Sequence, residues 1–144
     1  MSPLTEKRFL PVRTAGAEER IRLEKAIQDR LSREPDLLFA YIHGSFVTSG
    51  AFRDIDVGLY TRLHKDLSYE TELSYELSQF LGQEVEVKVI NEAPVAFQMA
   101  VLRDGRLLFS VDDVVRSNFI EEVGRRYRTY AHFRNVYMEA IGDK

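Results

Sequence analysis

Hydrophobic and polar positions along this 144-residue chain change their period several times, and the changes mark alternating helices and strands. Apolar residues that recur every three or four positions predict a helix. Apolar and polar residues that alternate, or a short apolar run between turn residues, predict a strand. The expected helices are residues 17–33, 67–81, 94–102 and 112–141, and the expected strands are residues 38–42, 54–60, 84–90 and 107–110.

This order predicts an α/β (α+β) fold: a small mixed sheet flanked by helices, with a long C-terminal helix. A chain of 144 residues fits one domain, which we expect at residues 17–144. Residues 1–16 contain Pro3 and Pro11 and predict an N-terminal arm that is irregular or forms a partner-facing strand. The arm lacks the apolar segment of a signal peptide, and no run of apolar residues is long enough for a membrane span.

Composition narrows the function classes. The chain has no cysteine, which excludes disulfides, thiol catalysis and cysteine-ligated zinc, and agrees with a cytoplasmic location. Its formal charge of −3 argues against extensive nucleic-acid binding, which normally needs a basic excess.

The candidate chemistry begins where the strand at residues 38–42 ends. Gly44 lets the backbone approach a phosphate closely, and Ser45 adds a hydroxyl and a backbone N–H. The next strand opens with Asp54 and Asp56, whose side chains project from one face because strand residues alternate. Two carboxylates on one face are typical ligands of a hard divalent cation such as Mg²⁺.

A third carboxylate is expected on the strand at residues 84–90, where acidic and apolar residues alternate. If this strand pairs with the one at residues 54–60, Glu86 meets Asp54 and Asp56 at one edge, and Glu84 is its competitor. Taken alone, an alternating acidic strand is more often a solvated sheet face. Beside the aspartate pair, we interpret it as part of a site.

The pattern Gly-Ser-x8-Asp-x-Asp resembles the signature of the DNA polymerase β-like nucleotidyltransferase superfamily. Within it the chain is most similar to the minimal nucleotidyltransferase (MNT) family, the MntA-type antitoxins encoded beside HEPN-domain toxins. Two features depart from the family pattern: the spacer between serine and the first aspartate is commonly two residues longer, and the third carboxylate is commonly aspartate. The matching residues include Val85-Glu86-Val87, Asn91-Glu92-Ala93-Pro94 and Asp104-Gly105-Arg106-Leu107-Leu108-Phe109.

The resemblance implies an enzyme that transfers AMP from ATP to a tyrosine of a partner HEPN toxin and so acts as an antitoxin. Asp54, Asp56 and Glu86 would be both the catalytic residues and the ligands of two Mg²⁺ ions. Glu86 would also accept the proton of the attacking hydroxyl, and Gly44 and Ser45 would hold the β and γ phosphates. Two alternatives stay open: an antitoxin that neutralises its partner by binding alone, and transfer to a small molecule such as an aminoglycoside. The absence of room for a second substrate-binding domain counts against the latter.

The expected C-terminal helix carries an apolar stripe that is too long to cover a small sheet. Either Gly124 breaks this helix, or part of it extends to another chain in a homo- or hetero-oligomer. Core packing and a protein interface explain such a stripe about equally well. The stripe consists of Val115, Phe119, Val123, Tyr127, Tyr130, Tyr137 and Ile141.

Two further groups of polar residues have less specific meanings. The arginines near Arg126 favour a solvated or acid-paired helix face, and a HEPN-type nuclease built on Arg126 and His132 would need an all-helical fold that the strands contradict. His43 precedes Gly44 and could line a nucleotide pocket, although a histidine at a strand end is more often structural.

Overall fold

The computed structural model describes residues 11–142. The strands are β1 (Arg13–Thr14), β2 (Leu37–His43), β3 (Ala51–Phe52), β4 (Ile55–Thr61), β5 (Val85–Val89) and β6 (Arg106–Ser110), and the helices are α2 (Ala17–Leu31), α3 (Ser45–Thr48), α4 (Leu67–Leu81), α5 (Val95–Asp104) and α6 (Asp113–Gly142).

The main sheet has the strand order β5-β4-β2-β6. β2 pairs antiparallel with β4 and β6, whereas β4 and β5 are parallel and are joined through α4. The sheet is therefore mixed, as the sequence predicts. The parallel register places Asp56 opposite Glu86.

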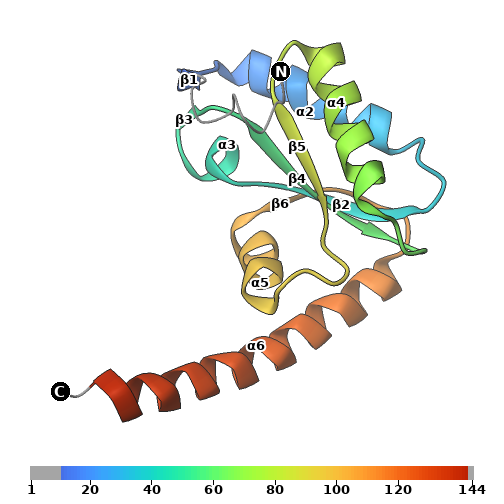
Figure 1. Ribbon diagram of the computed structural model, residues 1–144. Helices are drawn as coiled ribbons and strands as arrows, with labels where there is room; N and C mark the ends of the chain where they lie inside the picture. The colour runs from blue at the N-terminus through green and yellow to red at the C-terminus, as the bar shows by residue number, and fades with distance from the viewer. Residues whose placement is uncertain (1–10, 143–144) are drawn as a thin grey trace.

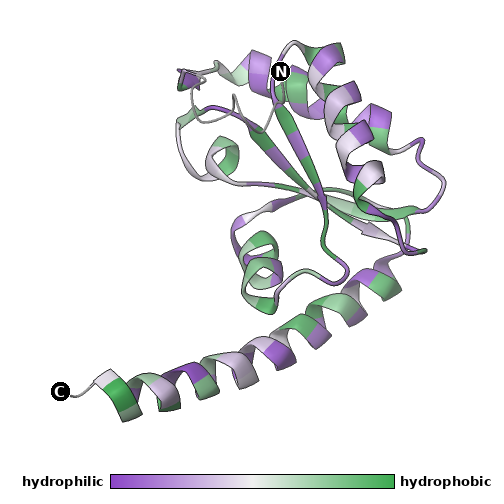
Figure 2. Ribbon diagram, in the orientation of Figure 1, coloured by the Kyte–Doolittle hydropathy of each residue, from purple (hydrophilic) through white to green (hydrophobic). Residues whose placement is uncertain are grey.

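Helices cover both faces of the sheet (Figure 1). α2 and α4 pack on one face, where Ile55, Val57 and the other inward residues of β4 and β5 are buried. α5 and the first half of α6 pack on the opposite face, against Phe39, Tyr41 and Ile90. β2 lies in the middle and is apolar on both faces, which explains its continuous hydrophobic run (Figure 2).

The helix boundaries follow local signals. α4 has the predicted bounds because the Asp66 carboxylate caps its first turn, accepting from the Tyr69 backbone N–H, and Gly82 ends it in the left-handed conformation with φ 62°. α2 ends at Leu31, two residues before the predicted end, where the Ser32 N–H still bonds to the Gln28 carbonyl. α5 runs two residues beyond the predicted Leu102.

The strands also differ slightly from the prediction. β4 begins at Ile55, so Asp54 lies in the turn before the strand. The short elements α3 and β3 were not expected from the hydrophobic pattern. Of the predicted arm, residues 1–10 lie outside the described residues, and Arg13–Thr14 forms a strand that pairs with β3 of the same chain.

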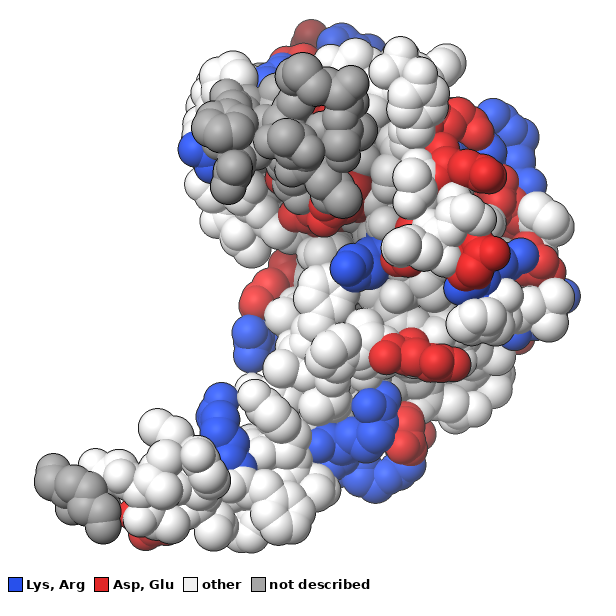
Figure 3. Space-filling model, viewed as in Figure 1, with Lys and Arg blue, Asp and Glu red and all other residues white. Residues whose placement is uncertain are grey.

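The long helix α6 passes through Gly124 without a break and extends away from the sheet (Figure 1). Its first half is anchored by buried Phe119 and Val123, and Arg126 donates to the Gln98 side-chain oxygen of α5 at 2.9 Å. None of residues 127–142 is buried. Figure 3 shows basic side chains gathered over the middle of α6 and mostly uncharged atoms toward its end.

Within residues 11–142, no helix combines the length and apolar character that a membrane crossing requires.

Candidate active site

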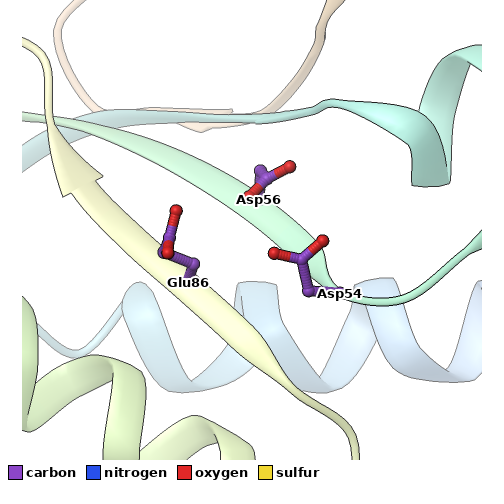
Figure 4. A group of neighbouring side chains, drawn as sticks. All are labelled: Asp54, Asp56 and Glu86. Atoms are coloured by element: carbon purple, nitrogen blue, oxygen red, sulfur yellow. The ribbon is translucent and has the colours of Figure 1, made fainter. Parts of the chain in front are cut away.

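Three carboxylates converge at the edge of the sheet where β4 begins. Asp54 comes from the turn before β4, Asp56 from β4 and Glu86 from β5, and one oxygen of each lies within 4.8 Å of the others. Figure 4 shows the three side chains turned toward a common space. Asp54 is buried, with 7% of its surface exposed, and Asp56 and Glu86 are half-buried.

The structure therefore brings together the three acids that the sequence singles out, and it leaves Glu84 outside the cluster. Glu84 lies just before β5, where its backbone carbonyl accepts the N–H of Ile55 at 2.9 Å. Three carboxylates concentrate negative charge, which is costly in a partly buried site unless a cation compensates it. An oxygen-only donor set of this kind fits a hard divalent cation.

Gly44 lies directly against this cluster. Its backbone adopts φ 79° and ψ −164°, a conformation that is essentially restricted to glycine. A Cβ at this position would come within 2.2 Å of the Asp56 Oδ2 atom, so no other residue fits without moving the carboxylate. The Gly44 carbonyl accepts the N–H groups of Val47 and Thr48, and Ser45 is exposed at the start of α3.

A guanidinium from α2 braces the loop that follows Gly44. Arg20 donates to the carbonyl of Phe46 at 2.5 Å and to the carbonyl of Gly50 at 3.1 Å. Its guanidinium also lies 4.6 Å from the ring centre of Phe46 and 5.3 Å from that of Phe52, and these two buried rings meet edge to face at 4.8 Å. Phe46 follows the Gly44 turn and Phe52 precedes Asp54, so Arg20 connects both sides of the site.

A second brace holds the residue before Asp54. Buried Gln83 donates its amide to the carbonyls of Arg53 and Glu84, at 3.1 and 3.2 Å. Arg13 donates to the Gln83 side-chain oxygen at 2.8 Å, which fixes the orientation of the amide. The short connection between Ser45 and Asp54 is therefore fastened at several backbone carbonyls.

From the sequence, His43 could either line a nucleotide pocket or be a structural residue at a strand end. It lies opposite Asp56 in the β2–β4 register and lines a cavity of about 360 Å³ together with Asp56, Glu86, Lys88 and Phe97. Its Nε2 atom is buried and has no hydrogen-bond partner in the described part of the chain. Burial lowers the pKa of the imidazole, although the carboxylates of Glu86 and Asp54 oppose the shift. His43 is thus a neutral wall of the cavity near neutral pH.

Two other residues of this cavity carry different sequence signals. Lys88 follows Glu86 by two positions and shares its strand face, so the alternation of β5 could have identified it. Phe97 lies on α5 and contacts the His43 ring edge to face at 5.6 Å. No local pattern distinguishes Phe97 from the other apolar residues of α5, and only the packing of α5 on the sheet reveals its place.

Comparison with known proteins agrees with this geometry. The sequence model of the family described as "Polymerase beta, Nucleotidyltransferase" matches residues 25–114, which is more than half of the chain and contains all five predicted site residues. A search of curated proteins found no match.

Several solved structures share the fold. An MNT antitoxin in complex with tri-AMPylated HEPN toxin from Shewanella oneidensis matches with a TM-score of 0.67 and 17% identity, over 82% of this chain and 98% of that chain. The toxin–antitoxin MntA-HepT matches with a TM-score of 0.68 and 18% identity, over 85% and 97%. A toxin–antitoxin with AMP-PNP matches with a TM-score of 0.67 and 19% identity, over 88% and 98%.

These likenesses confirm the predicted polymerase β-like fold, including the small mixed sheet and the long C-terminal helix. Together with the family match across the acid cluster and the Gly44 turn, they establish that the chain belongs to the polymerase beta nucleotidyltransferase family.

Proposed function

We propose that this protein transfers AMP from ATP to a tyrosine of a partner HEPN toxin and thereby acts as an antitoxin. The observation that carries the proposal is the acid cluster of Asp54, Asp56 and Glu86, held against the Gly44 turn in a nucleotidyltransferase fold. The AMPylated toxin bound to one structural relative and the AMP-PNP held by another support the choice of acceptor and donor.

Each residue of the site has a role in the proposed reaction. Asp54, Asp56 and Glu86 would ligate Mg²⁺, which supplies charge neutralisation for the triphosphate and activates the acceptor hydroxyl. Glu86 lies at the outer strand, and we propose that it accepts the hydroxyl proton. Gly44 and Ser45 would orient the β and γ phosphates, because the Gly44 backbone lies beside Asp56 and the Ser45 hydroxyl is exposed.

The transfer needs no reagent besides ATP and the acceptor hydroxyl. The acceptor oxygen forms a bond to the α phosphorus while the bond between the α phosphorus and the bridging oxygen breaks, and pyrophosphate leaves with that electron pair. ATP as donor agrees with a cytoplasmic location, which we also propose.

The experiment uses the chain, labelled ATP and Mg²⁺, with and without the small helical protein encoded by a neighbouring gene. Intact mass should show an AMP-sized addition on the partner, lost in Asp54→Asn and Glu86→Gln and kept in Asp29→Asn, which removes an exposed carboxylate of α2 outside the site. A stable complex without any addition would contradict the proposed transfer.

That second result would favour the alternative, an antitoxin that neutralises its partner by binding alone. The observation behind this alternative is the far half of α6, where Phe133, Tyr137 and Ile141 are each at least half exposed. Full neutralisation by the Asp54→Asn variant would separate binding from catalysis.

A further inference from the structure

The cavity of about 360 Å³ beside the acid cluster has walls of two kinds. Asp56, Glu86 and Lys88 supply charged side chains, whereas His43 and Phe97 supply aromatic rings. Its volume lies at the lower end of the range for ligand pockets, which runs from about 300 to 1,000 Å³. A ligand that matches both walls has an aromatic body and a polar tip.

The two rings form an aromatic corner. His43 and Phe97 meet edge to face, with ring centres 5.6 Å apart and an angle of 83° between the ring planes. Phe97 is only half-buried, so part of its apolar surface remains uncovered in a cavity that also contains carboxylates. Because aromatic rings associate at centre separations of about 4.5–7 Å, a third ring can pack against this corner.

Two glycines leave the space that His43 occupies. A Cβ at Gly58 would lie 3.7 Å from His43 Cδ2, and a Cβ at Gly105 would lie 3.2 Å from His43 Cβ, which is closer than most Cβ contacts in proteins. The buried Nε2 atom of His43 bonds to none of residues 11–142. Packing therefore places this ring.

The turn of α5 that carries Phe97 is fastened to the end of β5. The amide of the next residue, buried Gln98, donates to the carbonyls of Ile90 and Asn91 at 2.7 and 3.1 Å. Arg126 of α6 donates to the Gln98 side-chain oxygen at 2.9 Å, which fixes the orientation of the amide. Phe97 thus lies on a turn that is held by three hydrogen bonds, so the corner is preorganised.

The location of the cavity favours the acceptor over ATP as its occupant. Glu86, which we propose as the proton acceptor, lines the cavity, whereas Gly44 and Ser45, which would orient the phosphates, are not among the described residues that line it. A larger cavity of about 630 Å³ shares Lys88 and Phe97 with it. This larger space has room for the polypeptide on either side of an acceptor side chain.

We propose that the corner of His43 and Phe97 is the acceptor subsite, which takes the phenol ring of a tyrosine and discriminates against aliphatic hydroxyls. The inference rests on the proposed function. The ring packs on the corner and directs its hydroxyl to Glu86, which takes the proton. The phenol oxygen bonds to the α phosphorus of ATP, and pyrophosphate leaves with the electrons of the broken bond. A serine hydroxyl would leave the corner uncovered.

The first test measures AMP transfer at varied concentrations of partner and of ATP. We expect Phe97→Ala to raise the KM for the partner about tenfold and to leave the KM for ATP within about twofold. Phe97→Leu should lie between the two, because it keeps apolar volume without the ring. The matched control is Phe80→Ala, which removes a ring that is 75% exposed on α4 and should change neither KM.

An unchanged KM for the partner in Phe97→Ala would overturn the inference. A raised KM for ATP in the same variant would also overturn it, because the ring would then contact the adenine of the donor.

The second test changes the acceptor. The modified tyrosine of the partner is located by peptide mass spectrometry and replaced by serine. We expect the wild-type enzyme to modify this serine about 100-fold more slowly than the tyrosine. Equal rates for the two acceptors would contradict selection of a ring.

A binding test does not depend on transfer. The chain has three histidines, so the imidazole signals of His43 can be followed by NMR. N-acetyltyrosinamide is titrated into the chain saturated with Mg²⁺ and a non-hydrolysable ATP analogue. We expect the His43 signals to shift, those of His132 on α6 to stay, and Phe97→Ala to abolish the shift. N-acetylserinamide should cause none. Equal responses of His43 to both compounds, or to neither, would refute the subsite.

The outcomes separate this inference from the proposed function. A wild type that transfers AMP while Phe97→Ala behaves like Phe80→Ala would overturn the subsite and leave the proposed function standing. A wild type that adds no AMP would contradict the proposed function, and the NMR titration would still decide whether the corner binds a phenol ring.

Discussion

The acid site and the far half of α6 each cost free energy in an isolated chain, the first through clustered carboxylates and the second through exposed apolar side chains. They differ in how far the rest of the chain holds them in place. Three carboxylates lie with one oxygen of each within 4.8 Å of the others, and the backbone around them is braced by Arg20, Gln83 and the Gly44 turn, all supplied by the chain itself. Residues 127–142 of α6 carry exposed aromatic and aliphatic side chains, and none of them is buried. The first region is preorganised for a ligand, whereas the apolar side chains of the second are left uncovered by residues 11–142.

The largest loss of AMP transfer is expected when one of the three carboxylates of the proposed metal site is removed. Asp56→Asn should lower AMP transfer by about 10³-fold or more, because one ligand of the proposed metal site is lost. Millimolar Mg²⁺ should raise the melting temperature of the wild type and leave that of Asp56→Asn unchanged. Differential scanning fluorimetry with and without EDTA measures this, and equal Mg²⁺ responses in both proteins would contradict the assignment.

Gly44→Ala tests how tightly the turn and the carboxylate are coupled. The added Cβ would meet Asp56 Oδ2 at 2.2 Å and force alanine into a glycine-only conformation, so we expect about 1–3 kcal/mol of destabilisation. Transfer should fall by about 10²-fold because Asp56 is displaced. Gly50→Ala is the matched control, since a Cβ there meets nothing within 4 Å. Similar losses in both variants would show that the close approach at Gly44 is unimportant.

Arg20→Ala tests the brace from outside the cluster. Loss of the bonds to Phe46 and Gly50 should destabilise the fold by about 2 kcal/mol, measured by urea unfolding. It should also raise the KM for ATP about tenfold, because the loop beside Ser45 loosens. Arg20→Lys keeps the charge and should restore only part of the KM, since it lacks the planar fork.

The control for this brace is Arg22→Ala on the exposed face of the same helix. It should change neither stability nor KM. An unchanged KM in Arg20→Ala, whatever its stability, would mean that the brace supports the fold alone.

The smallest effect on the stability of the isolated chain is expected in the far half of α6. Val123→Ala should cost about 2 kcal/mol because it leaves a cavity in the core, whereas Phe133→Ala should change stability by less than about 0.5 kcal/mol. In contrast, Phe133→Ala should weaken partner binding measured by calorimetry. Unaltered affinity for the partner in Phe133→Ala and Tyr137→Ala would show that the partner binds to another surface.

Sequence reasoning was most accurate where local chemistry decides the structure. The bounds of α4 follow from a capping aspartate and a terminal glycine, and the meeting of Asp56 with Glu86 follows from alternation in two adjacent strands. The braces could not be predicted in this way. Arg20 and Gly50 are separated by 30 residues, and nothing in the local pattern distinguishes Arg20 from Arg22. Short elements such as α3 and β3 likewise depend on tertiary contacts rather than on periodicity.

The most direct test of the account is a crystal structure of the chain with Mn²⁺ and a non-hydrolysable ATP analogue, in which anomalous scattering locates the metal. We predict Mn²⁺ among the carboxylates of Asp54, Asp56 and Glu86, with the terminal phosphates beside Gly44 and Ser45. Metal and nucleotide bound elsewhere, or absent from this cluster at saturating concentrations, would contradict the proposal that these acids form a nucleotidyltransfer site.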